Sequence, residues 1–424
     1  MQRVLCQDVL HYLDERVKVM GWIDVVRRIG ALNFVVLRDR SGLVQVVWEG
    51  KLDSLPPQSV IAAWGIVRQD PRAPGGAEVV AESIELISAS ASPLPCDFDG
   101  RNLSGLDSLL EHRVVSLRGR SARLAMSAKS EFCRVFRDFL GEHGFTEVHT
   151  PKIVATGTEG GADLFEVDYF GRKAYLAQSP QLYKQMMVST GLERVFETGP
   201  VFRAEEHATS RHTNEFTSLD LEMGFIDDVE DVMTLEEQLL RRAMHHLRTV
   251  LEHTEEQALV PSVDRIPRYD VDEARLLVRE VSGHELPEGD LGPVGERLVG
   301  EAVLEQSGVE FVFVTGYSQE IRPFYAMPDT ANPPKTKTFD LLFRGTEVTT
   351  GGQRIHDYNM LLDMMHKRRL EPLKFRGYLE AFKYGMPPHG GLAIGLERFV
   401  MKLLRLSNIR EACTFPRDRT RLEP

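Results

Sequence analysis

The stretch Gly199–Glu222 reads GPVFRAEEHATSRHTNEFTSLDLE, and it decides how the rest of the chain is interpreted. Two β-like arms flank a polar loop, so the stretch predicts a hairpin that turns Arg203 and Phe216 toward one ligand. A guanidinium suits a phosphate through paired N–H donors, and a Phe ring suits a purine by stacking. The same composition also fits a solvated, charged hairpin around a core Phe. The other polar residues that stand out in this stretch are Glu205, Arg211, His212 and Asp220.

A second segment, Gly390–Phe399, reads GGLAIGLERF and leads into an apolar, helix-like run. Its small residues would let a strand approach a ligand closely just before Arg398. Taken alone, the segment also fits a glycine-rich strand that packs under a helix.

A third segment, Phe339–His356, places Asp340 and Glu347 among apolar and small residues. Carboxylate oxygens of this kind suit Mg²⁺, which bridges substrate phosphates. Arg354 follows two glycines and could clamp a carboxylate with two hydrogen bonds. Paired carboxylates also occur in glycoside hydrolases, but that interpretation leaves the arginines of all three segments without a role.

Other nucleotide and hydrolase motifs are absent from the sequence. It contains no G-x-x-x-x-G-K-[ST], no G-x-G-x-x-G after a strand and no G-x-S-x-G. A nucleotide site in this chain would therefore depend on arginines and metal-binding carboxylates.

Outside these segments, the amino-acid composition of the chain changes near residues 88–106, where SASASPLP marks a linker. Short β-like runs precede it and predict a small OB-type barrel. Amphipathic helices at 121–143 and 228–256 follow, with strand-like runs between and after them, which indicates an α+β domain on a mainly antiparallel sheet. We expect a barrel over 1–88, a hinge over 89–120 and a helix-flanked sheet domain over 121–424.

Composition limits the classes of protein to which the chain can belong. The 424 residues carry 51 Lys+Arg and 63 Asp+Glu, a net charge of −12, which by itself argues against a nucleic-acid binder coated in positive charge. The 4 cysteines are scattered and predict neither a disulfide framework nor a zinc site. With no long apolar run, the sequence favours a cytoplasmic protein without a membrane partner.

Together the three segments resemble the class II aminoacyl-tRNA synthetases of the aspartyl, asparaginyl and lysyl subgroup. Phe145–Ile153 (FTEVHTPKI) is similar to motif 1 of that class, with Pro151 at a homodimer interface. The hairpin is similar to motif 2, and Gly395–Phe399 to motif 3. The resemblance spans nearly the whole chain and implies a tRNA-binding OB domain, a hinge and a catalytic domain that uses ATP with Mg²⁺.

Within that subgroup the chain resembles the aspartyl enzymes, and the runs HTPKI, TGTEGG and FPRDRTRLEP together with its compact length resemble their archaeal type. Lys184 in LAQSPQLYKQ matches a lysine that, with the arginine at the position of Arg354, holds the carboxylate of the substrate L-aspartate. Asparaginyl enzymes lack this lysine, because a neutral amide would leave a buried ammonium partly uncompensated. Asp220 in SLDLE also matches the aspartyl pattern.

The resemblance assigns roles to individual residues. Arg203 would bind the α-phosphate of ATP and Phe216 would stack on adenine, while Arg211, His212 and Arg398 would meet the β- and γ-phosphates, near Glu205. Three further groups follow from the same resemblance: Glu159 and Gln181 for the α-ammonium; Glu347, Asp340 and Thr350 for Mg²⁺; and His389 beside the amino acid.

In the barrel, the resemblance implies an anticodon platform. Phe34 would stack on the central base, Gln45 would read its edge, Arg27 or Arg28 would meet the phosphate backbone and Glu78 would read the first base. Asp24 and Pro74 stand where strict archaeal-type enzymes carry Trp and Lys. These departures resemble relaxed enzymes that aspartylate both tRNA-Asp and tRNA-Asn and depend on a partner amidotransferase.

Several alternatives stay open at this point. They are a strict aspartyl enzyme, an asparaginyl enzyme, an ammonia-dependent asparagine synthetase of the same catalytic fold and a non-catalytic RNA-binding relative. The asparagine synthetases lack the barrel, and a protein released from catalysis need not keep Arg203, Glu347, Arg354 and Arg398.

Overall fold

The computed structural model of the chain describes residues 2–50, 55–99, 104–156, 164–205, 209–252 and 254–424. These residues divide into two compact units, Met1–Pro95 and Cys96–Pro424. Part of the segment expected as a hinge is helical and belongs to the second unit. Arg113, in α2 (Arg113–Ser116), is buried and donates to the carbonyls of Thr414 (2.9 Å) and Cys413 (2.5 Å).

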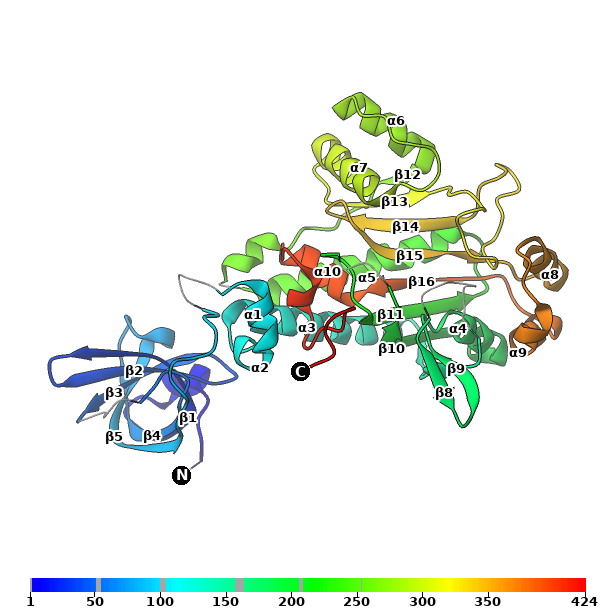
Figure 1. Cartoon of the computed structure of the whole chain (residues 1–424). Helices are drawn as coiled ribbons and strands as arrows, with labels where there is room; N and C mark the ends of the chain where they lie inside the picture. The colour runs from blue at the N-terminus through cyan, green and yellow to red at the C-terminus, as the bar shows by residue number, and fades with distance from the viewer. Residues whose placement is uncertain (1, 51–54, 100–103, 157–163, 206–208, 253) are drawn as a thin grey trace. The chain divides into compact units, whose positions relative to one another are not determined.

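The first unit is a closed barrel in the strand order β1-β2-β3-β5-β4, shown in blue in Figure 1. Apolar residues alternate along each strand, so that Val35 and Leu37 face the core while Phe34 and Val36 stay partly exposed. The structure therefore confirms the predicted OB-type barrel. Its strands are β1 (Arg16–Ile29), β2 (Leu32–Arg38), β3 (Leu43–Glu49), β4 (Val60–Gln69) and β5 (Ala77–Ser88).

The second unit is built on a sheet with the order β12-β13-β14-β15-β16-β11-β10-β6. Neighbouring strands are antiparallel except at the two edges, where β6 and β12 run parallel to their neighbours. The mainly antiparallel sheet is thus confirmed. Its strands are β6 (Thr146–Glu147), β10 (Arg194–Phe202), β11 (Glu215–Gly224), β12 (Arg268–Asp270), β13 (Phe311–Thr315), β14 (Thr338–Phe343), β15 (Glu347–Arg354) and β16 (His389–Gly395).

A smaller sheet with the order β7-β9-β8 lies in the same unit, together with helices at both ends of the large sheet (Figure 1). The strands of the smaller sheet are β7 (Ile153–Val154), β8 (Glu166–Tyr169) and β9 (Arg172–Leu176). The shorter α-helices of this unit, besides α2, are α1 (Leu106–Glu111), α4 (Gln181–Met187), α6 (Val271–Ser282), α7 (Gly292–Ser307), α8 (Tyr358–Lys367), α9 (Arg376–Lys383) and α10 (Leu396–Leu403).

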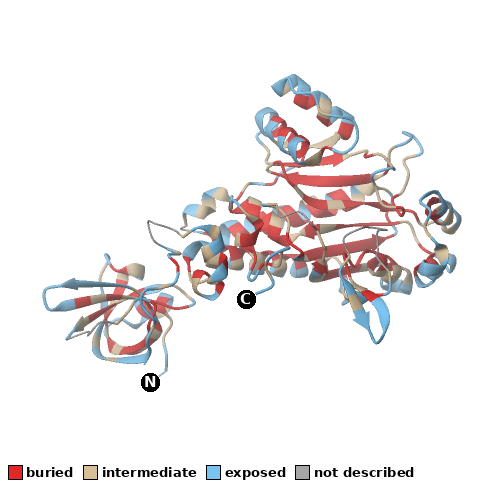
Figure 2. Ribbon diagram, viewed as in Figure 1, coloured by how far each residue is buried: buried red, intermediate tan, exposed pale blue. Residues whose placement is uncertain are grey.

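Two long helices, α3 (Arg120–Glu142) and α5 (Val229–Val250), pack on the large sheet and share its main core. The buried, red ribbon in Figure 2 runs through these helices and the central strands. The expected end of the second helix at Glu256 is wrong, because α5 ends at Val250. Arg248 in its last turn donates to the carbonyl of Val260 at 2.7 Å, so the chain has already reversed direction there.

Within the described residues, no helix combines the length and the apolar character needed to cross a membrane.

Candidate active site

Strands β10 and β11 form the hairpin predicted from the sequence, with Val201 opposite Phe216 and Phe202 opposite Glu215. Arg203 follows the end of β10, and its guanidinium carbon lies 5.4 Å from the centre of the Phe216 ring. Asn214 Nδ2 donates to the carbonyl of Arg203 at 2.7 Å and fixes the backbone at this point. The predicted pairing of an arginine with an aromatic ring is therefore present on one face of the hairpin.

A second wall comes from β15 and α10. Arg398 lies in the first turn of α10 and donates from Nη1 to the carbonyl of Glu347 at 2.9 Å. The same nitrogen lies 3.6 Å from the Glu347 carboxylate, which also accepts a 2.9 Å hydrogen bond from Thr350 Oγ1. An arginine, a carboxylate and a hydroxyl thus meet at the start of β15.

The hairpin and this second wall enclose one cavity. Strand β16 lies between β11 and β15, and its small residues Ala393 and Gly395 form part of the lining. Residues distant in the sequence therefore face one space. The predicted residues that line it are Arg203, Glu205, Arg211, His212, Phe216, Glu347, Thr350 and Arg398.

The cavity is lined by three arginines and three glutamates: Arg203, Arg211, Arg398, Glu205, Glu347 and Glu397. Arg211 Nη1 donates to Glu296 Oε2 at 3.1 Å, and Glu296 also accepts from the backbone N–H of Glu347 at 2.9 Å. Burial lowers the pKa of His212; Glu205 opposes this effect, and the cavity arginines reinforce it. His212 is therefore held neutral at pH 7, and the guanidinium groups carry the positive charge.

Glu397 is a residue of the cavity that sequence reasoning missed. Its carboxylate accepts from Lys129 Nζ at 2.6 Å and from the N–H and Oγ1 of Thr217 at 2.9 and 3.1 Å. Because Thr217 follows Phe216 and Glu397 precedes Arg398, this carboxylate fixes the two walls of the cavity relative to each other. Its position directly before Arg398 was the available signal.

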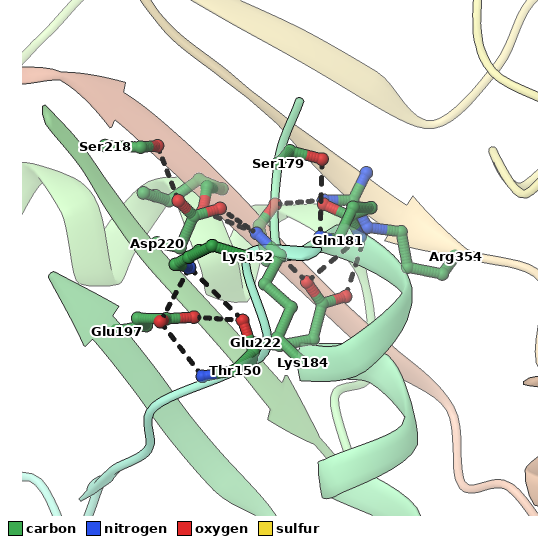
Figure 3. A network of polar contacts seen from close by, with 12 residues as sticks. Thr150, Lys152, Ser179, Gln181, Lys184, Glu197, Ser218, Asp220, Glu222 and Arg354 are labelled. Carbon is green, nitrogen blue, oxygen red and sulfur yellow. Dashed lines mark hydrogen bonds and ion pairs between the residues drawn. The ribbon is translucent and has the colours of Figure 1, made fainter. Parts of the chain in front are cut away.

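A second, buried cluster lies where α4 meets β11 and β16. Figure 3 shows Gln181 and Lys184 on α4 turned toward Asp220 and Glu222 on β11. Lys184 Nζ lies 3.0 Å from Asp220 Oδ1, 2.9 Å from the carbonyl of Leu392 and 3.5 Å from Glu222 Oε2. Among the predicted residues, Gln181, Lys184, Asp220 and Arg354 therefore belong to one cluster.

Glu222 is the centre of this cluster and was not predicted. It accepts from Arg354 Nε at 3.1 Å and from Gln181 Nε2 at 3.4 Å, in addition to its pairing with Lys184. Burial would raise the pKa of Glu222, but Arg354 and Lys184 outweigh burial and hold the pKa below its usual value. Alternation along a strand places Glu222 on the same face as Asp220, which was a usable signal in SLDLE.

His389 lies opposite Arg354 in the β15–β16 register and is fully buried. Its Nδ1 is 2.9 Å from the carbonyl of Pro387, and its Nε2 is 3.3 Å from Gln185 Oε1. Burial lowers the pKa of His389 to about 4, so the ring is neutral at pH 7. Tyr378 donates to the same Gln185 oxygen at 2.8 Å and closes this side of the cluster.

A further buried carboxylate lies beside the cluster. Glu197 on β10 stands opposite Asp220 and accepts from Lys152 Nζ at 2.8 Å and from the N–H and Oγ1 of Thr150 at 3.0 and 2.7 Å (Figure 3). These contacts fix the segment that follows β6 against the hairpin. Neither Glu197 nor Lys152 was predicted from the sequence.

Asp340 is buried on β14 and lies opposite Thr350 in the β14–β15 register. Arg322 Nη2 donates to its Oδ2 at 2.5 Å. Burial raises the pKa of Asp340 to about 6; Arg322 opposes this shift and Glu347 adds to it. The sequence predicted the proximity of Asp340 to Glu347 and Thr350, but not the arginine beside it.

Glu159 lies outside the described residues. Among the residues that the structure does describe, no group of three or more His, Cys, Asp and Glu side chains is arranged to hold a metal ion by itself.

In the barrel, the predicted platform residues share one outward face. Arg27 lies opposite Phe34 in the β1–β2 register, and Gln45 lies opposite Glu78 in the β3–β5 register. Gln45 Nε2 donates to Glu78 Oε2 at 2.8 Å. The register of β2 with β3 places Val36 beside Gln45, two residues along the strand from Phe34.

The two predicted specificity positions lie elsewhere on the barrel. Asp24 occupies a break in the β1–β2 register, and its Oδ1 lies 3.4 Å from Nε of the buried Arg38. Pro74 begins the short turn between β4 and β5.

Comparisons with known proteins agree with this arrangement. Residues 105–419 match the family described as "tRNA synthetases class II (D, K and N)", and residues 17–87 match the "OB-fold nucleic acid binding domain". The chain is 48% identical to an aspartate–tRNA(Asp/Asn) ligase of Deinococcus radiodurans over 433 residues, which cover 100% of the chain and 99% of that protein.

Two further proteins are similar to nearly the whole chain or to all of it. An aspartate–tRNA(Asp) ligase of Pyrococcus abyssi is 43% identical over 426 residues, covering 97% of the chain and 96% of the relative. The crystal structure of an asparaginyl-tRNA synthetase from Pyrococcus horikoshii, complexed with asparaginyl-adenylate, superimposes with a TM-score of 0.91 at 33% identity and covers 100% of both chains.

Proposed function

Because the chain belongs to the class II tRNA synthetases of the D, K and N group, we propose that its cavity binds ATP and its buried cluster binds L-aspartate. The chain aspartylates tRNA, as its full-length similarity to aspartate–tRNA ligases indicates. The reaction proceeds through aspartyl-adenylate, which then transfers its aspartyl group to the 3′-terminal ribose of the tRNA.

The observation that carries the choice of aspartate is the buried ammonium of Lys184. It lies within 3.5 Å of two carboxylates, in a cluster that also holds the Arg354 guanidinium. A substrate side-chain carboxylate offers two acceptor oxygens to these donor cations, whereas the amide of asparagine offers one acceptor and would turn its own NH2 donors toward them. Gln181, in the same cluster, and Glu159 serve the α-ammonium of the substrate.

ATP lies along the cavity between the hairpin and α10. Phe216 stacks on the adenine ring, and Arg203 beside it binds the α-phosphate. Arg211, His212 and Arg398 lie toward the β- and γ-phosphates, where Glu205 completes the lining. His389 flanks the amino acid rather than the nucleotide, since it packs behind Arg354 and not on the cavity wall.

Glu347, Thr350 and Asp340 fit a Mg²⁺ ion that arrives with ATP. Oδ1 of Asp340 is buried and has no hydrogen-bond partner among the described residues, and the Glu347 carboxylate borders the cavity. Mg²⁺ keeps several waters and uses substrate phosphates as ligands, so two carboxylates and a hydroxyl suffice. When bound, the ion supplies positive charge to the phosphate oxygens.

The first step needs positioning more than proton transfer. A carboxylate is already nucleophilic, so the α-carboxylate of aspartate attacks the α-phosphorus without a general base, and pyrophosphate leaves. Arg203 and Arg398 neutralise the charge that moves onto the phosphate oxygens, and the fixed walls hold both substrates in line. The neutral histidines take no proton in this scheme.

The outward face of the barrel reads the anticodon. Phe34 stacks on the central base, Gln45 and Glu78 contact base edges, and Arg27 meets the phosphate backbone. The acidic total charge does not oppose this role, because binding depends on where the basic residues lie.

We infer that the chain aspartylates tRNA-Asn as well as tRNA-Asp. Asp24 and Pro74 replace the restrictive residues, and the relative at 48% identity is an aspartate–tRNA(Asp/Asn) ligase. A relaxed enzyme of this kind works with a tRNA-dependent amidotransferase. We further expect a cytoplasmic homodimer with Pro151 at its interface.

Aspartate-dependent ATP–pyrophosphate exchange tests the activation step. We expect exchange with aspartate and not with asparagine; exchange with asparagine alone would identify an asparaginyl enzyme, and no exchange would indicate a non-catalytic relative. Charging of purified tRNA-Asn transcript tests the relaxed specificity. Aspartylation of tRNA-Asp without any aspartylation of tRNA-Asn would reject it.

A further inference from the structure

A short segment between β13 and β14 contacts both parts of the site. Tyr325 lies beside the amino-acid cluster, because the Arg354 guanidinium carbon is 5.6 Å from its ring centre and the N–H of Ile355 donates to its carbonyl at 2.8 Å. Three residues earlier, Arg322 donates to Asp340. The segment therefore connects the predicted aspartate pocket with the predicted metal ligands.

The guanidinium of Arg322 is held in place from several sides. Its carbon lies 4.0 Å from the centre of the Tyr317 ring, and the side chain is 10% exposed. Arg368, just after α8, donates to the carbonyls of Glu320 at 2.9 Å and Arg322 at 2.8 Å. Both the backbone and the side chain at this position are thereby fixed.

Asp340 presents two unlike oxygens as a result. Oδ2 accepts the 2.5 Å hydrogen bond from Arg322, while Oδ1 is buried and has no hydrogen-bond partner in the described part of the chain. Because Asp340 and Thr350 are register partners, their side chains lie on the same face of the sheet. Thr350 in turn bonds to Glu347 at 2.9 Å.

We propose that Arg322 is a positioning residue for the metal: it holds Asp340 through Oδ2 and leaves Oδ1 as an oxygen ligand for the divalent cation that accompanies ATP. The proposal rests on the proposed function. Without the guanidinium, Asp340 would be a buried charge with only the hydroxyls of Thr350 and Tyr317 as polar neighbours, and no cation would hold its carboxylate in place. Side chains that orient metal ligands commonly set the metal affinity of a site.

The experiment measures Mn²⁺ binding to the full chain with ATP present and aspartate absent, by the electron paramagnetic resonance signal of free Mn²⁺, after subtraction of the Mn²⁺ held by the same concentration of ATP without protein. Mn²⁺ prefers the same oxygen ligands as Mg²⁺. We expect Arg322→Met to raise the dissociation constant for Mn²⁺ about tenfold or more, and Arg322→Lys to give a smaller rise. Asp340→Asn should weaken binding at least as much as Arg322→Met.

A matched control is Arg297→Met, which removes an arginine that is 55% exposed and paired with Glu301 on the same helix. This variant should bind Mn²⁺ like the wild type. Excess Mg²⁺ should restore the exchange rate of Arg322→Lys, an effect that a purely structural role would not produce.

Folded Arg322 variants that bind Mn²⁺ as tightly as the wild type, or more tightly, would overturn the proposal. If Arg322→Met does not fold, Arg322→Lys decides, with circular dichroism as the check on folding. The exchange assay separates the two levels of inference. A wild-type chain without aspartate-dependent exchange contradicts the proposed function, whereas normal exchange together with unchanged Mn²⁺ binding in the variants contradicts only the role of Arg322.

Discussion

Lys184 Nζ lies 3.0 Å from Asp220 Oδ1, and the two side chains expose only 1% and 2% of their surfaces. The same ammonium donates to the carbonyl of Leu392, so it joins α4, β11 and β16 at one point. A charge buried this deeply is retained at a cost, because both ions have lost their hydration. The pair therefore links the stability of the domain to the proposed amino-acid site.

Replacement of Lys184 by Met should lower the stability of the domain and raise KM for aspartate. It leaves Asp220 and Glu222 with less positive charge nearby, and breaking a buried pair in this way costs about 3–5 kcal/mol of unfolding free energy. Urea unfolding measures the loss, and ATP–pyrophosphate exchange measures the accompanying rise in KM for aspartate. The control is Lys173→Met, whose side chain is 73% exposed and which should change neither quantity. An unchanged KM for aspartate in folded Lys184→Met would contradict the assignment.

Loss of either cavity arginine should nearly abolish activation. Arg203→Ala and Arg398→Ala each remove a cavity-lining guanidinium proposed to bind the phosphates of ATP, and losses of about 10²–10³-fold in kcat are typical for such donors. Exchange assays on purified, folded variants measure the effect. Arg279→Ala on α6, where the side chain is 66% exposed, should retain normal exchange. Near-normal rates in Arg203→Ala or Arg398→Ala would refute the ATP site.

Phe34→Ala should separate tRNA binding from activation. Loss of base stacking costs about 1–3 kcal/mol, which is about a 5- to 150-fold rise in KM for tRNA. Exchange without tRNA should not change, since Phe34 belongs to the barrel unit. Leu86→Ala, at a residue 46% exposed on β5, serves as the control. Equal aminoacylation kinetics in Phe34→Ala and Leu86→Ala would show that Phe34 does not contact the anticodon.

The burial of Glu236 predicts an unusual dependence of the stability of the chain on pH. It is fully buried on α5, where Thr349 Oγ1 donates to it at 2.6 Å, and burial raises its pKa from 4.5 to about 8. The folded chain then binds one proton more than the unfolded chain between about pH 4.5 and 8. Its stability should fall as pH rises through this window, with a slope of up to about 1.4 kcal/mol per unit.

Glu236→Gln should remove that contribution, because the amide does not titrate. Urea unfolding at pH 5.5 and at pH 8 should show the variant gaining stability relative to the wild type as pH rises. Glu252→Gln, at an exposed position, should follow the wild type at both pH values. The same stability difference between Glu236→Gln and the wild type at both pH values would rule out this explanation.

Local sequence patterns predicted most of the fold because the relevant signals are short-range. Alternation in β2 and β3 and the apolar stripe of α3 depend on neighbouring residues. Helix α6, which no predicted element covers, begins with a capping box formed by Asp270 and Glu273, a local signal readable as D-x-x-E. The end of α5 was missed because a tertiary bond from Arg248 to Val260 accompanies it.

In the candidate site, too, residues marked by local sequence patterns were predicted and residues held by tertiary contacts were not. Residues on the hairpin and on β15 were predicted because motifs and resemblance mark them, and Glu222 was within reach through strand alternation. Arg322 had no such signal, since it lies in an irregular segment and its partner Asp340 is 18 residues away. A contact of that kind follows from how the chain folds back, and no local pattern encodes it.

The place of β16 in the sheet has a consequence for how the protein folds. This strand is late in the chain, yet it lies between β11 and β15, pairing Ser218 with Gly395 and Thr350 with Ala393. Until it inserts, the hairpin wall and the β15 wall belong to two separate half-sheets. Non-local pairings of this kind form slowly. A nascent chain on the ribosome should therefore be unable to retain ATP until its final strand has been synthesised and inserted.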